Sequence, residues 1–468
     1  MSDPSTEPTV AIAGGGLAGL AAACALADSG FRVALFERRP YLGGRASSYE
    51  HPGTGEVVDN CQHVLFRVCT SLVEFYRRIG VENKIRWYDE MTFIEPGGRM
   101  SVLRASPLPA PLHTAPSFLR FPFLAAKDKL AIARAIAALA LRRQPDTAGS
   151  FLQWCHQHGQ TENAIQRFWK PILVSALSED LDLISISYAA QVVRESMKAH
   201  AARHMGVPSI PLTELYNHAG DYIRGRGGEI CFRTSLESFI AEASGIHVRT
   251  GQGEQVFDYL ILALPFDGLA RVLPQIPEAT PLRERLSHFE TSPITGIHLW
   301  FDRQISDLDH AVLLNRTVQW MFHKSRLLAR REGNNDDSGG SYIELVISAS
   351  KNLIDKSRSE IVELALKEVR EFFPAARSAN LVKSAVIKEL HATYSPRPGI
   401  DAYRPSQTTT WPRVFLAGDF TATGWPATME GAVRSGYLAA EALLRATGRN
   451  LRFLAPDLPA EGLMRLFH

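Results

Sequence analysis

The chain has 468 residues, 45% of them hydrophobic, which is enough to bury the cores of two or three domains. Its 51 basic and 49 acidic residues leave a net charge of +2, which excludes the strongly basic surface of a nucleic-acid-binding protein. The five cysteines form no CxxC pair, a usage typical of reduced thiols, and we expect no metal site. The polar N-terminus and the absence of a long apolar run predict neither a signal peptide nor a membrane-spanning helix, and hence a cytoplasmic protein.

The first predicted elements form a βαβ unit typical of dinucleotide binding. Residues 9–14 are an apolar run that suits a buried parallel strand, and residues 31–36 predict its neighbour. Residues 17–28 between them are small and apolar, which favours a helix packed tightly on the sheet. The N-terminus of such a helix offers unpaired N–H groups to phosphate groups.

Four residues of this unit carry the binding pattern. Gly14 permits the tight turn, Gly16 lets the backbone approach a pyrophosphate, and Gly19 lets the helix lie close to the strand. Glu37 follows the second strand, where a carboxylate accepts hydrogen bonds from ribose hydroxyls. Because all the parts occur in order, we predict dinucleotide binding rather than a glycine-rich corner without a ligand.

Residues 121–143 combine an apolar stretch with flanking cations and predict a helix. One interpretation is an interfacial helix that contacts a membrane peripherally, at its inner face. The other is a core helix of a substrate domain, whose charged ends extend to solvent. Further along the chain, residues 229–234 and 257–265 predict strands, the second as a buried edge strand that returns to the nucleotide-binding sheet. Residues 294–301 and 341–348 alternate as strands do, around a glycine-rich loop at 333–340.

A second glycine motif stands near the end of the chain. Gly418 and Asp419 follow the apolar residues 414–417, and a helix is predicted from about Met429 to Leu444. Two such motifs about 400 residues apart indicate one long dinucleotide that is held at both ends.

The motifs resemble those of the large FAD-dependent family that includes amine oxidases, protoporphyrinogen oxidase and carotenoid desaturases. Gly43, Gly44 and Arg45 are similar to its second signature, and Gly418–Asp419 is similar to its closing motif. The resemblance implies that the segment Gly43–Arg45 lies along the flavin side of the cofactor and that Asp419 meets the ribityl–pyrophosphate region. It also implies that the backbone of Leu236 meets the adenine and that the helix start, with Met429 and Ala432, points towards the isoalloxazine. No cysteine follows Cys231, so we expect FAD to be bound non-covalently.

The expected fold class is α/β, with a Rossmann-like FAD-binding domain interleaved with a mixed α+β substrate domain. The FAD-binding domain is expected at residues 8–100, 226–285 and 405–447, and the substrate domain at residues 101–225 and 286–404.

A narrower resemblance points to the squalene-associated FAD enzymes, whose activity is hydroxysqualene dehydroxylase. The strings that carry it are Asp59–His63, Phe168–Leu173, Val207–Leu215 and, most specifically, Thr423–Ala432. Cys61 departs from the glycine expected in the first string, which puts the local backbone geometry in question. The resemblance implies an apolar C30 isoprenoid alcohol as substrate and squalene, a precursor of hopanoids, as product.

Such a reaction protonates an allylic hydroxyl, which leaves as water, and replaces it with hydride from reduced flavin. It needs a general acid, a water-poor channel and an electron donor that reduces the flavin. Asp59 or His63 is the expected acid, although either could have a purely structural role. Glu430 is the third candidate, and its alternative is a carboxylate at the first turn of its own helix.

Three other classes of protein have the same fold and are alternative interpretations of the sequence. A carotenoid-type desaturase or isomerase would move hydride from substrate to flavin in a similar tunnel. An amine oxidase would carry a lysine on the strand at residues 291–301, which contains none. A non-catalytic escort of prenylated lipids would lack flavin chemistry, and the presence of both FAD signatures argues against it.

Overall fold

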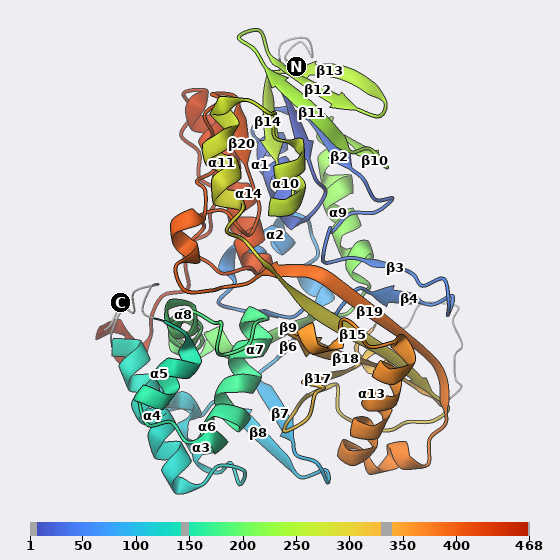
Figure 1. Ribbon diagram of the computed structural model, residues 1–468, viewed down its shortest axis with the longest axis vertical. Coiled ribbons are helices and arrows are strands. Elements are labelled where there is room, and N and C mark those ends of the chain that lie inside the picture. The colour runs from blue at the N-terminus through green and yellow to red at the C-terminus, as the bar shows by residue number, and fades with distance from the viewer. Residues whose placement is uncertain (1–6, 142–148, 329–338, 467–468) are drawn as a thin grey trace.

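The apolar run at the start of the chain forms the centre of a parallel sheet in the order β10-β2-β1-β14-β20. The computed structural model describes residues 7–141, 149–328 and 339–466 (Figure 1). The sheet contains β1 (Thr9–Ala13), β2 (Arg32–Glu37), β10 (Glu229–Phe232), β14 (Tyr259–Leu262) and β20 (Val414–Leu416). It therefore joins strands from the beginning, middle and end of the chain.

Helices from equally distant parts of the chain cover this sheet. The helix α1 (Leu17–Asp28) packs against α14 (Met429–Ala446) and α9 (Leu212–Arg224), and α14 also contacts α2 (Thr70–Arg78). The approach of α1 and α14 depends on small residues, since a Cβ atom at Gly436 would overlap the carbonyl oxygen of Ala18. The antiparallel strands β11 (Leu236–Ala241), β12 (Ile246–Thr250) and β13 (Gly253–Phe257) lie at the far end of this half, beyond α10 (Phe266–Val272) and α11 (Thr280–Leu286) (Figure 1).

The second half contains a seven-stranded sheet and a layer of helices. The sheet order is β19-β15-β18-β17-β16-β7-β8, antiparallel except for the β16–β7 pair. Its strands are β7 (Glu90–Ile94), β8 (Met100–Arg104), β15 (Thr291–Phe301), β16 (His310–Leu313), β17 (Trp320–His323), β18 (Ser341–Ser348) and β19 (Leu381–Tyr394). The helix α13 (Arg358–Phe372) packs beside β19, and the short α12 (Lys324–Leu327) follows β17.

The helical layer is built from residues 112–197. It comprises the 3₁₀ turn η2 (Leu112–Thr114), α3 (Ala115–Leu119), α4 (Ala126–Leu141), α5 (Phe151–Gln157), α6 (Glu162–Ala164) with a π-helical turn (Ile165–Trp169), α7 (Lys170–Leu177) and α8 (Ile186–Met197). Two small sheets connect the halves: β3 (Ser48–Glu50) with β4 (Val57–Asp59), and β5 (Leu65–Phe66) with β9 (Met205–Pro208) and β6 (Ile85–Tyr88).

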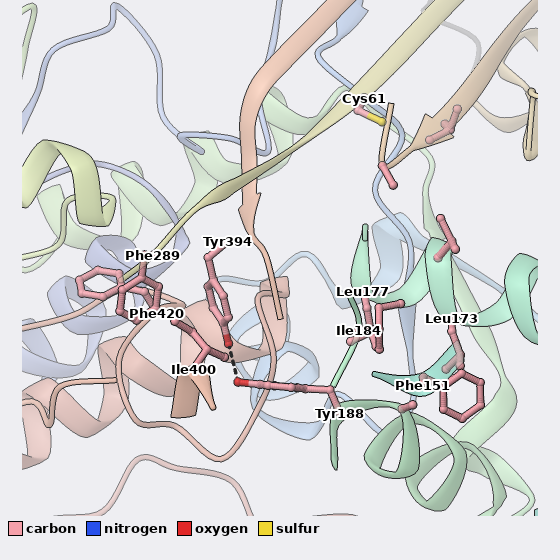
Figure 2. Close-up of a cluster of buried hydrophobic side chains, with 14 of the residues drawn as sticks. Cys61, Phe151, Leu173, Leu177, Ile184, Tyr188, Phe289, Tyr394, Ile400 and Phe420 are labelled. Carbon is pink, nitrogen blue, oxygen red and sulfur yellow. Dashed lines mark hydrogen bonds between the residues drawn. The ribbon is translucent and has the colours of Figure 1, made fainter. Parts of the chain in front are cut away.

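One buried hydrophobic cluster runs from one half to the other. It includes Phe36 and Leu262 of the parallel sheet and Leu173 of the helical layer. At the junction the hydroxyl groups of Tyr188 and Tyr394 are 3.0 Å apart and share a hydrogen bond (Figure 2). This shared core holds the two halves in one arrangement.

The structure differs from the expected organisation in four places, and no helix among the described residues is long and apolar enough to span a bilayer. Residues 259–262 form an internal strand between β1 and β20 rather than an edge strand. The first segment of the nucleotide-binding half ends before residue 100, because β7 belongs to the seven-stranded sheet, and α9 packs on α1 although residues 212–224 were assigned to the substrate domain. The expected helix at 121–143 begins only at Ala126, and its end at residues 142–143, like most of the loop at 333–340, lies outside the described residues.

Candidate active site

The turn after β1 forms a backbone cradle that only glycine permits. Gly14 has a φ of +113°, a region that disfavours other residues, and a Cβ atom at Gly19 would overlap the Gly14 carbonyl oxygen. Gly43 donates a hydrogen bond to Gly15 O at 2.9 Å, and a Cβ atom at Gly44 would lie 2.9 Å from the Cα atom of Gly16. The residue before α1 provides no side-chain cap, so the first N–H groups of this helix remain for a phosphate group.

Glu37 supports the same turn from the end of β2. Its Oε2 accepts a hydrogen bond from Gly15 N at 2.7 Å, and its Oε1 accepts one from Arg39 N at 2.8 Å. Glu37 as a whole is 6% exposed. Its bonds to backbone N–H groups fix the loop in which a ribose would lie, and a contact with ribose hydroxyls stays a prediction.

The closing motif reaches the cradle from the other end of the chain. Arg45 Nη2 lies 2.7 Å from Asp419 Oδ1, and Arg45 Nη1 donates to the carbonyl oxygen of Ala392 on β19 at 2.9 Å. The preceding Gly418 has a φ of +147° and donates to Ser435 Oγ on α14. Both glycine motifs therefore meet at one site, beside the C-terminal end of the strand β19.

Arg404 organises this closing loop, and no sequence motif marks it. Its guanidinium, with a side chain 3% exposed, donates hydrogen bonds to the carbonyl oxygens of Asp419, Thr421 and Trp425 and to Thr423 Oγ1. One buried cation thus holds most of the loop before α14. Such a role depends on contacts about twenty positions along the chain, which a local pattern does not reveal.

The start of α14 faces the same site. Thr428 caps the helix, because its Oγ1 accepts from Gly431 N at 3.1 Å. Glu430 turns away, and its carboxylate accepts hydrogen bonds from Ser71 N and Leu72 N at the start of α2. Glu430 therefore caps a neighbouring helix, a structural role that differs from both the acid and the local carboxylate that the sequence suggested.

A single cavity of about 1330 Å³ connects these parts. All of the residues predicted to hold the cofactor line it except Gly19, which is used in packing α1 on the turn: Gly14, Gly16, Glu37, Gly43, Gly44, Arg45, Leu236, Gly418, Asp419, Met429 and Ala432. The volume exceeds the range of about 300–1,000 Å³ typical of a site for one small ligand. The cavity therefore has room for a second molecule beside a dinucleotide.

Beyond the cradle the cavity wall becomes apolar. It is formed by side chains of the helical layer and the seven-stranded sheet: Phe93, Leu103, Phe118, Ile136, Phe168, Ile172, Val192, Val312, Trp320, Phe322 and Val346.

Residues 60–63 form the wall where the two parts of the cavity meet. Asn60 Nδ2 donates to the carbonyl oxygen of Arg45, which ties this wall to the cradle. His63 Nδ1 lies 2.7 Å from the carbonyl oxygen of Cys61, an acceptor, so Nδ1 carries the proton and Nε2 has a free lone pair. Burial lowers the pKa of His63, which favours the neutral ring. Cys61 adopts no left-handed backbone conformation, so this position does not need the expected glycine.

Asp59 does not line the cavity. Its Oδ1 accepts hydrogen bonds from Ser48 Oγ at 2.6 Å and Leu212 N at 3.2 Å, and its Oδ2 lies 2.6 Å from Lys324 Nζ. Burial alone would raise the pKa of Asp59, but Lys324 and the hydrogen bonds hold it below its usual value. The geometry therefore does not support Asp59 as a general acid, because the carboxylate is ionised, paired and turned away from the cavity.

Lys324 is the centre of a buried ionic cluster that the sequence did not indicate. Its ammonium donates to Gln62 Oε1 at 2.7 Å and lies 3.4 Å from Glu344 Oε2 on β18, and both charged side chains are at most 2% exposed. Burial raises the pKa of Glu344 to about 7, against the opposing charge of Lys324. This cluster supports the 60–63 wall from behind, through Asp59 and Gln62.

The fold and the site together define an FAD-dependent oxidoreductase. The backbone cradle, the unoccluded start of α1 and the convergent closing loop fit the two ends of a long dinucleotide. The profile of flavin-containing amine oxidoreductases matches residues 17–444, and the chain belongs to this family. When bound, FAD supplies the hydride acceptor or donor of the reaction.

Two relatives and one solved structure illustrate the similarity. The chain is 28% identical to a 15-cis-phytoene desaturase of Synechococcus elongatus over 461 residues, covering 93% of this chain and 95% of the relative. It is 29% identical to a probable zeta-carotene desaturase of the same organism, over 93% of this chain and 98% of the relative. A solved structure of putrescine oxidase shares the fold, with a TM-score of 0.71, 17% identity and coverage of 94% of this chain and 98% of that one.

Proposed function

We propose that the chain is an FAD-dependent desaturase of the carotenoid type, which acts on a long, linear, apolar isoprenoid. Two similar relatives, each aligned over nearly their full length, are named as phytoene and zeta-carotene desaturases. The main expectation from the sequence was dehydroxylation of hydroxysqualene. This proposal instead adopts the carotenoid-type desaturase, which the sequence analysis named as an alternative. The observation that carries it is the continuity of one cavity from the glycine cradle to an apolar wall.

The apolar wall suits a hydrocarbon substrate. Burial of carbon against Phe118, Phe168 and Trp320 supplies affinity in proportion to the apolar area removed from water, about 25 cal/mol per Å². Lys324, which stands behind the 60–63 wall, is turned to Asp59 and Glu344.

His63 supplies the proton chemistry of the proposed reaction. Desaturation removes hydride from one carbon and a proton from the next, and the remaining electron pair forms the new double bond. FAD, when bound, would supply the acceptor of the hydride, and the proton would pass to a base. The neutral ring of His63, with its Nδ1 proton held by Cys61 O, offers Nε2 as that base.

Reductive dehydroxylation of hydroxysqualene is the second candidate. It is favoured by the Thr423–Ala432 string, of which residues 425–430 line the cavity. This reaction needs a proton donor at the substrate oxygen, and the lowered pKa of His63 makes a protonated ring scarce near neutral pH. His63 in this wall is therefore better suited to act as a base than as an acid.

Product analysis under anaerobic conditions tests the two candidates. Oxidised enzyme is incubated with phytoene, and chemically reduced enzyme is incubated with hydroxysqualene, each with enzyme in slight excess. The proposal expects a polyene with a longer conjugated system from the first reaction and no squalene from the second. Squalene from the second reaction alone would overturn the proposal and establish the dehydroxylase.

A further inference from the structure

The segment that carries His63 has no regular secondary structure. Residues 60–64 connect β4 to β5 and form neither a helix nor a strand. His63 nevertheless lines the cavity, and its ring has to keep one orientation if Nε2 is to meet a substrate. An irregular segment keeps one conformation where contacts from neighbouring elements fix it. The contacts behind this segment therefore determine where the imidazole lies.

The first two residues of the segment are fixed through their main chain. Asn60 N donates to Ser47 O at 2.9 Å, and the Asn60 side chain donates to Arg45 O. An added Cβ atom at Gly296 on β15 would lie 3.2 Å from Asn60 O and 3.7 Å from Cys61 Cα, so the glycine lets the segment lie close against this strand (Figure 2). These contacts reach as far as Cys61.

Gln62 provides the next contact, and the two ends of its amide face different partners. Its Oε1 accepts a hydrogen bond from Lys324 Nζ at 2.7 Å, and its Nε2 donates to His63 O at 3.1 Å. The chemistry of the partners determines how the amide is turned, because an ammonium only donates and a carbonyl oxygen only accepts. Gln62 is 8% exposed, so water competes little for these bonds. The amide therefore ties the main chain of His63 to Lys324.

Lys324 is a firm anchor because carboxyl groups from two strands hold it. Its Nζ lies 2.6 Å from Asp59 Oδ2 on β4 and 3.4 Å from Glu344 Oε2 on β18. The side chain of Lys324 is 2% exposed, and attraction between charges is stronger in such poorly hydrated surroundings than at the surface. The ammonium therefore stays in one place.

The anchored residues stand on both sides of the acceptor that orients the imidazole. Cys61 O accepts the hydrogen bond from His63 Nδ1 at 2.7 Å. Asp59 and Gln62, which Lys324 holds, precede and follow Cys61 in the chain. A shift of either residue would displace the carbonyl group of Cys61, and the ring would move with it.

We propose that Gln62, anchored by Lys324, is a positioning residue that keeps the ring of His63 in one tautomer and one orientation. The action of the ring as a base rests on the proposed function, whereas the positioning does not. The charged groups that act on the ring are Asp59 on β4, Lys324 on α12 and Arg45 beside the glycine cradle. Because Gln62 is uncharged, its replacement alters the position of the ring and leaves these charges in place.

Gln62→Met is the variant that tests the positioning. Methionine has nearly the same length as glutamine but forms neither hydrogen bond. The variant leaves Lys324 paired with Asp59, whereas loss of Lys324 itself would leave a buried carboxylate without its partner and destabilise the fold. A change in Gln62→Met therefore reports on the amide and not on the ionic cluster.

Gln160→Met in the helical layer is the matched control. Gln160 is 7% exposed, and both ends of its amide are also bonded, since Oε1 accepts from Trp169 Nε1 and Nε2 donates to Ala131 O, each at 2.8 Å. Gln160 does not line the cavity. The two variants therefore lose similar buried hydrogen bonds, and only Gln62→Met loses them behind His63.

NMR of the FAD-loaded enzyme with isotope-labelled histidine measures the positioning without any substrate. The two ring nitrogens give separate signals that report which one carries the proton, and the spectrum of His63→Gln identifies those of His63. The proposal expects the proton on Nδ1 alone in the wild type and in Gln160→Met, and exchange between both tautomers in Gln62→Met. Mixed tautomers already in the wild type, or unchanged signals in Gln62→Met, would overturn the proposal.

Turnover of phytoene measures the consequence for the reaction. Gln62→Met should lower kcat by about 10²-fold, while KM, flavin content and melting temperature stay close to those of Gln160→Met. The effect should vanish when the base is absent, so Gln62→Met/His63→Gln should react no more slowly than His63→Gln. An equal loss with and without His63 would assign a merely structural role to Gln62 and overturn the proposal.

The two measurements separate this proposal from the proposed function. Tautomer exchange in Gln62→Met, with a wild type that turns over no isoprenoid, would refute the proposed function and leave the positioning intact. Turnover by the wild type, with unchanged ring signals in Gln62→Met, would refute the positioning and leave the proposed function intact.

Discussion

Arg45 Nη2 and Asp419 Oδ1 lie 2.7 Å apart, although 374 positions separate the two residues in the chain. The pair closes the site where the glycine cradle meets the loop before α14, and the side chain of Asp419 is 7% exposed. An FAD molecule would have to lie along this junction to reach both motifs.

Asp419→Ala should therefore weaken FAD binding. Loss of the carboxylate leaves Arg45 without its partner and removes an acceptor from the cofactor site, which we expect to raise the Kd for FAD by about tenfold or more. The ratio of flavin to protein after gel filtration, and the Kd from fluorescence titration, measure the effect. Glu56→Ala, which breaks the exposed pair with Lys383, is the control and should keep the full flavin content. Equal retention of flavin in both variants would show that the Arg45–Asp419 junction does not hold the cofactor.

Gly44→Ala should empty the cofactor site for a steric reason. Gly44 has a φ of +60°, and an added Cβ atom would lie 2.9 Å from Gly16 Cα. Gly55→Ala is a matched control, because Gly55 has a φ of +68° but no atom within 4 Å of the added carbon. Both variants bear the backbone cost of about 1–2 kcal/mol, and only the first distorts the cradle. We expect flavin to be lost from Gly44→Ala and retained by Gly55→Ala. Loss of flavin from both would mean that backbone strain alone is responsible.

His63→Gln should keep the flavin and slow the reaction. Without a base at this position we expect kcat to fall by about 10²–10⁴-fold. Because burial lowers the pKa of His63, the wild-type rate should be level near neutral pH and decline only below the ordinary histidine pKa of 6.5. The acidic limb should disappear in the variant. A variant with full activity, or with an unchanged acidic limb, removes His63 from the mechanism.

Glu344 should make the free energy of unfolding depend on pH. Its pKa is about 7 in the folded chain, raised by burial from an ordinary value of 4.5. The folded chain therefore binds more protons than the unfolded chain between these values, and stability decreases as the pH rises through this window. Between pH 5 and pH 7 the decrease should be about 2 kcal/mol, and it should be largely absent from Glu344→Gln. Urea unfolding at pH 5 and pH 7 measures it, with the exposed Glu363→Gln as the control. Parallel pH profiles in all three proteins would contradict the assignment.

Local patterns predicted those parts of the molecule that depend on nearby residues. The elements β1, α1 and β2 follow the sequence from 9 to 37 closely, because apolar periodicity and glycine placement determine them within one βαβ unit. The start of α14 at about Met429 was also expected, and the structure shows that the side chain of Thr428 caps this helix.

The parts that were missed depend on distant contacts. The position of β14 inside the sheet follows from its pairing with both β1 and β20. Local sequence patterns do not reveal this strand order. Lys324 and Arg404 each act through partners on other elements, so neither belongs to a motif. Asp59 was one of two expected acids because of its position in a family motif, but the strand β4 turns its side chain towards Lys324.

The reduction of the bound flavin by substrate tests the central proposal most directly. Oxidised, FAD-loaded enzyme is mixed anaerobically with phytoene or, separately, with putrescine, and flavin absorbance is followed in a stopped-flow instrument. The account predicts that phytoene bleaches the flavin in a single turnover while the amine leaves it oxidised. Bleaching by the amine, with no response to phytoene, would contradict the account.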